Sequence, residues 1–596
     1  MKEKILELMN SNNYVPKTLA DLSLLLDLDI NLLKEVLDEM EDDYLIKQTK
    51  KKKYDLLKKF NLYVGYIDIK DKGFGFIRSE EFPEDFYVPK EFVSGSMDND
   101  KVLFSITNND DTFGRKEAAV IEVISRSLKH VIGKIVLNRK GKKRFEPNDK
   151  KLDIFFEVTD FGISVVGDIV DYEIDEYINA ALVRGKVNYV IGNVNDVGID
   201  IKTIAYKYGF HQEFEQKVIN EVKSLNIDID AELKRRQIFT GNIITMDGED
   251  AKDLDDAIRI EKLSNGNYRL GVFIADVSYY VRENSKLDEA AFDRGTSVYL
   301  ADRVIPMLPH KLSNDLCSLN EDENKLVIAC IMEIDPYGEV VNHEIAEGVI
   351  KTKHRMTYTD VNLMLEDNDE AVIEKYQDIY PDLLLMEELS LILREMRNRR
   401  GALEFDIPES QIIVDEAGKP LDVILRTRGT GEKVIEDFML AANETVAETI
   451  ANLNLPFIYR VHDEPNSLKL EKVNIIAKSL GYKINARKNK VSPQALQTLL
   501  NSITEEDKGL STLLLRMMAK AKYSEKNIGH YGLASLCYTH FTSPIRRYPD
   551  LIVHRYLRKF LFNGEVSVKD QEVALSKIVL AATQSSKKER DAIDCE

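Results

Sequence analysis

Ile243-Ile-Thr-Met-Asp247-Gly-Glu249-Asp250-Ala-Lys-Asp253-Leu-Asp255-Asp256-Ala-Ile258 is the stretch of this sequence that says most about its fold. Its apolar start predicts a β-strand, and the apolar residues 270–277 predict another. Between these strands six carboxylates lie within ten residues, accompanied by one lysine. Carboxylates at this spacing repel one another strongly unless cations neutralise them. Flanking strands would hold the acids at a fixed place beside a core; the alternative is an acidic loop that only caps a strand.

The chemistry of this acidic cluster suits Mg²⁺, because hard carboxylate oxygens, water and substrate phosphate are its usual ligands. Two such ions about 4 Å apart can activate water and stabilise a leaving 3′-oxygen in phosphodiester hydrolysis. A calcium loop of the EF-hand type is excluded. A loop starting at Asp247 would need Gly at its sixth position and Glu at its twelfth, where the chain has Lys252 and Ile258.

The chain before this cluster predicts several small domains, as expected for 596 residues. Residues 1–60 predict three short helices and a hairpin, a winged-helix domain of the kind that binds nucleic acid or protein. Residues 61–125 and 126–205 each predict short strands with glycine turns and resemble cold-shock, OB-type β-barrels. Residues 206–235 predict a polar helical linker. Residues 236–596 predict one large α+β domain, with helices over residues 383–400, ended by Gly401, and over residues 436–452. The fold class is therefore multidomain α+β.

The first predicted barrel contains Lys72-Gly-Phe74-Gly-Phe76-Ile77, followed by the strand Asp85-Phe86-Tyr87-Val88. Alternation of Gly and Phe places two aromatic rings on one strand face with no side chain between them. We expect Phe74, Phe76 and Phe86 to stack on RNA bases, each stacked base contributing about 1–3 kcal/mol. Packing inside the barrel is the alternative.

The net charge of −20 is unusual for a protein that binds nucleic acid, but its distribution along the chain matters more. Residues 129–151 hold nine lysines and arginines against two acids, a local net charge of +7. We expect Lys140, Lys142, Lys143 and Arg144 in this segment to contact RNA, although a basic run can also be a solvated surface. A second basic run occupies residues 50–53.

Asp247-x5-Asp253-x-Asp255-Asp256 resembles the catalytic signature of the ribonuclease II/ribonuclease R family, in its RNB domain. Further motifs agree with the family in one order along the chain. They are Ile274-Ala-Asp-Val-Ser, Ser297-Val-Tyr-Leu, Val304-Ile-Pro-Met-Leu-Pro, Leu312-Ser-Asn-Asp-Leu-Cys-Ser-Leu, Arg400-Gly-Ala-Leu-Glu-Phe-Asp, Arg460-Val-His-Asp-Glu-Pro and His540-Phe-Thr-Ser-Pro-Ile-Arg-Arg-Tyr-Pro-Asp. The resemblance covers essentially the whole chain, and the order of its domains is that of the ribonuclease R branch.

The resemblance implies that Asp247, Asp253, Asp255 and Asp256 hold Mg²⁺, as two ions during catalysis. Asp255 is then the aspartate most closely tied to the chemistry. It also implies that Arg546 is the catalytic arginine, since a guanidinium forks onto phosphate oxygens and stabilises developing charge. For Arg547 two roles stay open: a phosphate contact, or an ion pair with Asp550.

Three further positions match family residues at the 3′ end of RNA. Tyr299 and Phe405 match the pair that sandwiches the last base, with core packing as the alternative. Glu436 matches a carboxylate near the terminal ribose, where a hydrogen bond to the 2′-hydroxyl would separate RNA from DNA. The alternative for Glu436 is an acid that complements a helix dipole. His462 and His540 are expected to support the site without acting as catalysts.

The resemblance therefore implies a processive 3′→5′ exoribonuclease that acts on single-stranded RNA 3′ ends and structured RNA with overhangs and releases nucleoside 5′-monophosphates. Four cysteines without a CxxC pair and the lack of a long apolar run predict a cytoplasmic protein without membrane contact. We also expect a monomer. The family usually continues into another barrel after the catalytic domain, so we expect a chain cut off within its last helix, beginning near Lys587.

Three rival functions are left by these observations. They are an RNA-binding protein made inactive by the missing C-terminal part, a winged-helix transcription factor, and a ribonuclease II-type enzyme that stalls at duplexes. Release of nucleotides with Mg²⁺ would exclude the inactive RNA-binding protein. Tighter binding of duplex DNA than of single-stranded RNA would favour the transcription factor. Passage through paired RNA would exclude the ribonuclease II-type enzyme.

Overall fold

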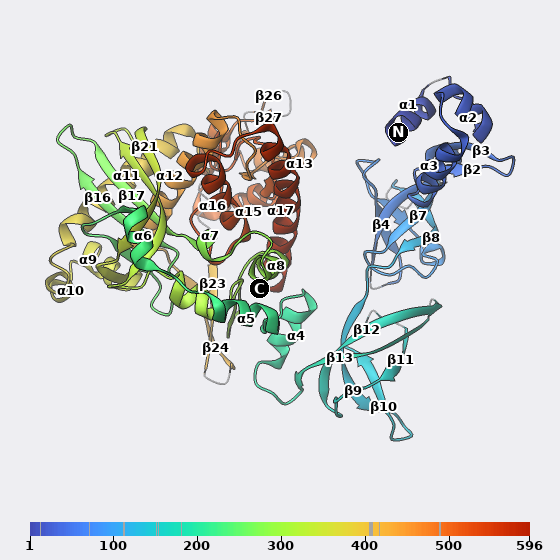
Figure 1. Ribbon diagram of the computed structural model, residues 1–596, viewed down its shortest axis with the longest axis horizontal. Helices are drawn as coiled ribbons and strands as arrows, with labels where there is room; N and C mark the ends of the chain where they lie inside the picture. The colour runs from blue at the N-terminus through green and yellow to red at the C-terminus, as the bar shows by residue number, and fades with distance from the viewer. Residues whose placement is uncertain are drawn as a thin grey trace. The chain divides into compact units, whose positions relative to one another are not determined.

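The structure is a computed structural model of residues 1–596. It describes residues 1–11, 13–70, 72–110, 114–150, 152, 154–179, 181–403, 409–415, 418–484, 486–487 and 490–596. The chain divides into two units, Met1–Lys207 and Tyr208–Glu596. Figure 1 shows the elements of each unit.

The first unit begins with three helices and a small sheet. The helices are α1 (Lys2–Asn10), α2 (Leu19–Leu26) and α3 (Ile30–Asp42), and the strands β1 (Lys17–Thr18), β2 (Ile46–Gln48) and β3 (Lys53–Leu56) pair in the order β1-β3-β2. Leu22, Leu33, Leu37 and Met40 form the buried core between them. Thr18 caps α2, its hydroxyl accepting the N–H of Asp21. The winged-helix assignment of this segment stays a prediction.

A closed five-stranded barrel follows, with the order β4-β5-β6-β8-β7. Its strands are β4 (Tyr63–Ile69), β5 (Gly75–Arg78), β6 (Phe86–Val88), β7 (Lys101–Asp110) and β8 (Lys116–Ser125). Alternation along β6 decides which aromatic ring faces inward. Phe86 is 4% exposed and lies in the barrel core with Ile77, so its predicted contact with RNA is wrong. Tyr87, the next residue, points to the other face of the strand.

A second five-stranded sheet has the order β10-β9-β12-β13-β11. Its strands are β9 (His130–Leu137), β10 (Lys143–Pro147), β11 (Phe155–Asp160), β12 (Asp168–Asn179) and β13 (Leu182–Asn193). The edge strands β10 and β11 lie close together, so the sheet curls around a core of Phe145, Phe156 and Tyr172. Stacked and edge-on contacts join these three rings at 4.8–5.2 Å between ring centroids. Helix α4 (Ile199–Lys207) closes the unit.

The segment predicted as a polar linker contains two amphipathic helices, α5 (Gln216–Ser224) and α6 (Ile229–Arg235). Val218 and Val222 on α5 are buried in the main core of the second unit. The segment from Tyr208 onward is therefore built into that unit.

The second unit is organised around a seven-stranded sheet of order β14-β21-β20-β17-β16-β15-β22. Its strands are β14 (Gln237–Ile238), β15 (Ile244–Asp247), β16 (Asp256–Lys262), β17 (Tyr268–Ala275), β20 (Asn324–Ile334), β21 (Val340–Lys351) and β22 (His354–Thr357). β15 pairs in parallel with β22, and β14 with β21, while the central pairs are antiparallel. The near-continuous burial of β17 and β20 shows that both faces of the sheet are covered.

Helices α11 (Tyr380–Arg400) and α12 (Thr430–Asn452) pack on each other beside this sheet, as Figure 1 shows. Gly401 ends α11 with a φ of 99°, which an L-residue rarely adopts, and its N–H bonds back to Arg397 and Asn398. This confirms the helix end predicted from the sequence. Helix α12 starts six residues before the predicted Glu436.

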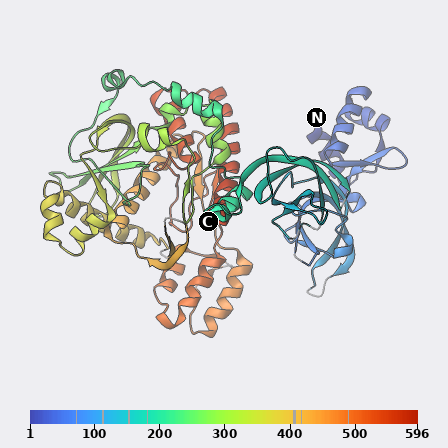
Figure 2. The ribbon, with the colours of Figure 1, turned by 90° about the horizontal axis from the view of Figure 1, so that it is seen from below.

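Helices α13 (Ser467–Ser479), α14 (Pro493–Leu500) and α15 (Lys508–Met517) have a separate apolar core that includes Leu470, Leu496 and Leu514. In Figure 2 these helices, coloured orange, form a lobe of their own within the second unit. The apolar side chains of this lobe therefore pack against one another and form a cluster distinct from the main core of the unit.

Helix α16 (Tyr548–Leu557), the π-helical turn η5 (Arg558–Phe562) and helix α17 (Val568–Cys595) complete the unit. The prediction of a helix that opens near Lys587 was wrong. Lys587 lies in the second half of α17, whose start is capped by the Ser567 hydroxyl on the N–H of Asp570.

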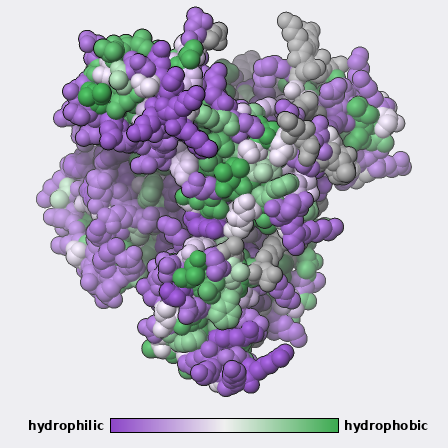
Figure 3. Space-filling view, turned by 90° about the vertical axis from the view of Figure 1, so that its right-hand side faces the viewer, coloured by the Kyte–Doolittle hydropathy of each residue, from purple (hydrophilic) through white to green (hydrophobic). Residues whose placement is uncertain are grey.

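The face of the molecule seen in Figure 3 is mainly hydrophilic, with scattered apolar areas, as a chain with 31% charged residues predicts. In the described part of the chain, no helix has the length and apolar composition needed to cross a membrane. Cys317, Cys330, Cys537 and Cys595 are free and buried.

Candidate active site

The acidic cluster lies where β15 ends and β16 begins. Asp247 is the last residue of β15, Asp256 is the first of β16, and a loop joins them. Arg355 on β22 fixes this loop by donating to the carbonyl oxygens of Glu249 and Ala251 at 2.9 and 2.7 Å. Neighbouring strands thus bring acids at both ends of the loop to one place.

A cavity of about 320 Å³ opens over the four aspartates. Its walls come from the acidic loop, from one face of α12 and from the segment that precedes α16. The lining residues are Asp247, Asp253, Asp255, Asp256, Tyr358, Glu432, Ile435, Glu436, Met439, Leu440, Asn443, Tyr538, Thr542, Ser543, Arg546 and Arg547. The aspartates and both arginines singled out from the sequence therefore share one cavity.

Asp255 joins the acidic loop to the segment before α16. Its side chain is only 3% exposed, and Oδ1 accepts the backbone N–H of Ile545 at 2.8 Å. Asp550 holds the same segment from the other side, because its Oδ1 accepts the N–H of Ser543 at 2.8 Å. The backbone that carries Arg546 is thus fixed by two buried carboxylates.

The electrostatics of the aspartates favour a bound cation. Burial raises the pKa of Asp256 to about 6, and it raises the pKa of Asp255 well above its ordinary value although Arg546 opposes the shift. Burial, followed by repulsion from Asp256 and Asp253, also raises the pKa of Asp247 well above the ordinary range. Oδ2 of Asp247, Asp255 and Asp256 is buried and has no hydrogen-bond partner within the described ranges. Buried carboxylate oxygens need such a partner or a cation.

Within the described residues, no three His, Cys, Asp or Glu side chains converge closely enough to hold a metal ion by themselves. The structure therefore does not bring the four predicted aspartates together as a complete ligand set. Mg²⁺ usually keeps several waters and takes one or two carboxylates together with substrate phosphate. The unpartnered oxygens and the hard oxygen donors therefore fit Mg²⁺.

The two adjacent arginines have different surroundings. The side chain of Arg546 is 43% exposed; Nη2 donates to the Ser543 hydroxyl at 3.0 Å, and Nε lies 3.8 Å from Oδ2 of Asp255. Arg547 instead forms a two-pronged ion pair with buried Asp550, at 2.9 Å from Nε and 2.7 Å from Nη2. Of the two roles open for Arg547, the structure contains the ion pair. Its predicted RNA contact is not supported, since the fork that would grip a phosphate is already occupied.

Tyr299, predicted to stack on a base, is 44% exposed, and its hydroxyl lies 3.4 Å from Oδ2 of Asp253. Its ring is therefore not a core aromatic, and it stands beside the acidic cluster. Phe405, its predicted partner in the sandwich, lies outside the described residues.

Glu436 lines the cavity, exposed, with Oε2 3.3 Å from Nη1 of Arg428. It lies well inside α12, because the helix begins at Thr430. The helix-dipole alternative therefore applies to Glu432, whose carboxylate accepts the N–H of Gly429 at 3.0 Å.

The two histidines in matched motifs bind neighbouring groups of the protein. His462 Nε2 lies 2.8 Å from the carbonyl of Ala519, and Nδ1 accepts the N–H of Gly532. His540 Nδ1 lies 2.8 Å from the Tyr523 hydroxyl, and burial lowers its pKa well below the ordinary value. Neither lines the cavity over the aspartates.

Sequence reasoning missed several residues of the cavity wall, above all Glu432 and Asn443. Asn443 is 3% exposed and accepts the N–H of Phe541 at 2.7 Å, so it anchors the strand-like segment that leads to Arg546. Glu432, Glu436 and Asn443 share one face of α12, since they are four and seven residues apart. This spacing was the only signal in the sequence, and other polar residues of α12, such as Lys433, Asp437 and Glu444, obscure it.

The first unit carries the other predicted RNA-binding residues. Phe74, Phe76 and Tyr87 form a half-buried aromatic group with ring centroids 5.6–5.8 Å apart, and the guanidinium of Arg115 lies over Phe76. Tyr87 thus takes the place predicted for Phe86. Lys140 and Lys142 are exposed at the turn between β9 and β10, and Lys143 and Arg144 are exposed at the start of β10. There Lys143 donates to the carbonyl of Ser164, and Arg144 pairs with Glu146.

Comparison with known proteins gives the same domain order. The RNB domain family matches residues 235–563, the ribonuclease B OB domain matches residues 65–123, and the cold shock domain matches residues 145–215. Ribonuclease R 1 of Lactococcus lactis subsp. lactis is 38% identical over the whole of this chain and 76% of its own length. The chain belongs to the ribonuclease R family.

Solved structures of a ribonuclease R agree with this fold. Mycoplasma genitalium RNase R in complex with ribose-methylated single-stranded RNA has a TM-score of 0.82 and 29% identity, covering 89% of this chain and 85% of that protein. Its complex with double-stranded RNA has a TM-score of 0.75 at the same identity, covering 85% of this chain and 88% of that protein. As a member of the ribonuclease R family, the chain is a hydrolytic 3′→5′ exoribonuclease.

Proposed function

We propose that this exoribonuclease degrades RNA processively from its 3′ end at the Asp247–Asp256 cluster, using Mg²⁺ and releasing nucleoside 5′-monophosphates. The observation that carries the proposal is the set of three buried carboxylate oxygens on Asp247, Asp255 and Asp256 that have no hydrogen-bond partner among the described residues, beside one cavity that Arg546 also lines. When bound there, Mg²⁺ would supply an activated water and charge neutralisation at the departing 3′-oxygen.

The protein's own residues would position the scissile phosphate. Arg546 is partly exposed and retains guanidinium N–H groups that can fork onto phosphate oxygens. Asp255 and Asp550 keep its backbone in place through the N–H groups of Ile545 and Ser543. A preorganised donor of this kind stabilises charge that develops in the transition state without reorganising during the reaction.

The terminal nucleotide would be held by residues around the same cavity. Exposed Tyr299 offers a ring for the last base, and Phe405 is proposed as the second ring of the sandwich. Stacking does not depend on base identity, as a general degradative enzyme requires. Glu436 lines the cavity wall, which supports the proposal that its carboxylate accepts a hydrogen bond from the terminal 2′-hydroxyl.

Upstream RNA would be bound by the first unit. Its aromatic group of Phe74, Phe76 and Tyr87 offers stacking surfaces, and the exposed turn with Lys140 and Lys142 offers phosphate contacts. We extend the proposal to paired RNA with a 3′ overhang, because a related RNase R has been solved with double-stranded RNA. A monomeric state and a cytoplasmic location stay predictions.

The decisive experiment follows 5′-labelled single-stranded RNA incubated with the protein and Mg²⁺. We expect a ladder that shortens from the 3′ end and disappears with EDTA or with Asp255→Asn, while Arg269→Gln on the exposed end of β17 leaves the rate unchanged. Intact RNA in the presence of Mg²⁺ would refute the proposed chemistry. A duplex with a 3′ overhang, run beside it, separates passage through paired RNA from stalling at the junction.

A further inference from the structure

The segment that leads to Arg546 is held at its backbone by buried side chains. The N–H of Phe541 donates to the Asn443 side chain at 2.7 Å, and the Phe541 carbonyl lies 2.8 Å from Nε2 of His554. Asn443 and His554 are almost completely buried. Together with the two aspartate contacts described above, these bonds fix the path of the backbone up to the arginine.

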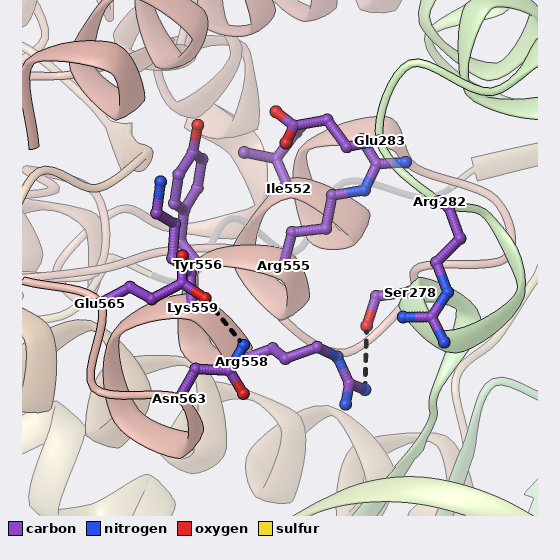
Figure 4. A pocket seen from close by; sticks show the side chains of 10 residues that line it. All are labelled: Ser278, Arg282, Glu283, Ile552, Arg555, Tyr556, Arg558, Lys559, Asn563 and Glu565. Atoms are coloured by element: carbon purple, nitrogen blue, oxygen red, sulfur yellow. Dashed lines mark hydrogen bonds between the residues drawn. The ribbon is translucent and has the colours of Figure 1, made fainter. Parts of the chain in front are cut away.

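Helix α16, which follows this segment, is anchored at its far end as well. Figure 4 shows Arg555 near the end of α16 and Arg558 in the turn η5 after it. Arg555 pairs with Asp288 at 2.7 Å and Arg558 with Asp276 at 2.6 Å, and both acids are buried. Breaking buried ion pairs is costly, so α16 and the segment before it form a rigid base for the Arg546 side chain.

Pro544 stiffens the three peptide bonds between Ser543 and Arg546. Its ring fixes its own φ and restricts the backbone of the residue before it. The Ser543 carbonyl accepts the N–H groups of Arg547 and Arg546 at 2.9 and 3.3 Å. The position of the Ser543 side chain relative to the Arg546 backbone is therefore set by the fold.

The hydroxyl of Ser543 is not used to close this turn. Serine in a turn often binds a backbone N–H two or three residues further on. Here the N–H of Ile545 donates to Asp255 and the N–H of Arg546 donates to the Ser543 carbonyl. The hydroxyl of this buried serine instead accepts Nη2 of Arg546 at 3.0 Å. In the described part of the chain, it is the only hydrogen-bond acceptor of that guanidinium.

This bond limits the directions that the guanidinium can take. A free arginine side chain has many accessible rotamers, and the acidic cluster attracts this one, since Nε lies 3.8 Å from Oδ2 of Asp255. With Nε beside Asp255 and Nη2 on Ser543, the planar group is held at two points. Nη1 and the second N–H of Nη2 are then left for phosphate oxygens.

We propose that Ser543 is a positioning residue of this nuclease, whose hydroxyl orients the guanidinium of Arg546 toward the scissile phosphate before RNA binds. The inference rests on the catalytic role proposed above for Arg546. A donor that is oriented in advance stabilises developing charge without reorganising during the reaction. Because Ser543 acts through the arginine, loss of its hydroxyl should lower the rate of cleavage and leave RNA affinity unchanged.

The test is the single-turnover rate with 5′-labelled single-stranded RNA, excess protein and Mg²⁺. Ser543→Ala should slow cleavage about tenfold, as expected for loss of a hydrogen bond to a charged group, at an unchanged half-saturating protein concentration. Ser543→Cys, which nearly keeps the volume but is a poor acceptor, should be equally slow, and Ser543→Thr should restore most of the rate. Ser535→Ala is the matched control, because this buried serine binds the carbonyl of Cys537 at 3.0 Å and does not line the cavity.

A double-substitution cycle separates positioning from a general loss of structure. In an Arg546→Met background there is no guanidinium to orient, so Ser543→Ala should cause no further slowing. Equal slowing in both backgrounds would overturn the proposal, because Ser543 would then act independently of the arginine. A wild-type rate in Ser543→Ala would overturn it as well.

The same rates keep this inference apart from the proposed function. Slow cleavage by Arg546→Met together with a wild-type rate in Ser543→Ala would refute the positioning role alone. A wild-type rate in Arg546→Met would refute the catalytic role of the arginine and, with it, the positioning role of Ser543.

Discussion

Arg546 and Arg547 follow each other in the chain but differ in burial and in partners. We therefore expect Arg546 to contribute to catalysis and Arg547 to the stability of the fold. Arg546 is partly exposed over the acidic cavity, with one hydroxyl partner and the carboxylate of Asp255 nearby. Arg547 is paired through two nitrogens with Asp550, which is fully buried. The sequence showed that two arginines were present and left the role of Arg547 open, because an ion pair depends on side-chain direction.

Arg546→Lys should lower kcat by about 100-fold without changing the free energy of unfolding. A lysine keeps the charge but loses the planar fork, and removal of one preorganised donor of this kind typically costs 10²–10³ in kcat. Single-turnover rates and urea unfolding of the same preparations would check both parts. A variant that is equally slow but markedly less stable would mean that Arg546 acts structurally.

Arg547→Met should destabilise the fold by about 3–5 kcal/mol, because it leaves the buried Asp550 carboxylate without its partner. Urea unfolding measures the change, with Arg269→Gln as a surface control expected to fall within about 0.5 kcal/mol of wild type. The double variant Arg547→Met/Asp550→Leu should recover part of the loss. Wild-type stability in Arg547→Met would contradict the structural role.

His530 gives a pH dependence with a definite sign. Burial, aided by neighbouring His462, lowers its pKa to about 3, while Nδ1 accepts the N–H of Leu533 at 3.2 Å. In the unfolded chain the imidazole takes up a proton near pH 6.5. Its contribution to stability is therefore fully present above pH 6.5 and is lost progressively as the pH falls toward 3.

The measurement compares unfolding free energies of wild type and His530→Asn at pH 7.5 and pH 5.0. The destabilisation caused by the substitution should shrink by up to about 2 kcal/mol at the lower pH, since one pKa unit corresponds to about 1.4 kcal/mol. His310→Asn, on the exposed surface, is the control for replacing a histidine. A destabilisation that stays constant between the two pH values would mean that His530 is already charged in the folded protein.

At the scale of elements, the spacing of apolar residues predicted strands and helices well wherever one face of the element is buried. The Gly–Phe alternation correctly indicated aromatic rings on an outer strand face. The short β6 strand could not be assigned in the same way, because Phe86 and Tyr87 are adjacent aromatics and only the register of the barrel decides which points inward. The start of α12 was misplaced for a related reason: its cap is Gly429 with the Glu432 carboxylate, a combination without the usual Ser, Thr, Asp or Asn.

The site shows the same division between local pattern and long-range contact. The four aspartates were predictable because they lie within ten residues of one another. Asn443, about a hundred residues before the backbone group it binds, was not predictable from spacing alone. Contacts between distant segments depend on the packing of α12 against the sheet, which no local pattern encodes.

Gly401→Ala should destabilise the fold by about 1–3 kcal/mol. Its φ of 99° is unfavourable for an L-residue, and a Cβ there would lie 2.7 Å from Cγ of Gln494, in the separate lobe. Gly509→Ala is the matched control: no atom lies within 4 Å of its added Cβ, and it stands in the first turn of α15, so a neutral or slightly stabilising effect is expected. Thermal unfolding of both variants distinguishes these outcomes, and equal melting temperatures would refute the strain argument.

At the scale of the whole molecule, charge is distributed unevenly along the chain. The chain carries −20 in total, yet residues 129–151 in the first unit carry +7. Domain order and fold class could be predicted from composition and motifs, because each domain has its own spacing of apolar residues and its own turn residues. Sequence pattern alone did not show that residues 208–235 are built into the core of the second unit.

Lys140→Gln/Lys142→Gln should weaken binding of single-stranded RNA and reduce the slope of log K against log salt by about 1.4. Each phosphate contact on a single strand contributes about 0.7 to that slope. Fluorescence anisotropy at several salt concentrations measures it, with Lys4→Gln/Lys34→Gln, which removes the same charge from exposed positions of α1 and α3, as the matched control. An unchanged slope in the first variant would show that the β9–β10 turn stays in solvent when RNA binds.

The hydrogen bond between Asp255 and Ile545 also bears on how an RNA complex could be captured for structure determination. An asparagine at position 255 can keep this bond only by turning its amide oxygen toward Ile545, which directs its NH₂ group at Arg546. The Asp255→Asn variant, used as an inactive enzyme that keeps RNA bound, would hold Arg546 away from the position it takes during turnover. In the part of the chain that the structure describes, the Asp253 side chain makes only a long contact with the Tyr299 hydroxyl at 3.4 Å, so Asp253→Asn would give a trapped complex closer to the reacting enzyme.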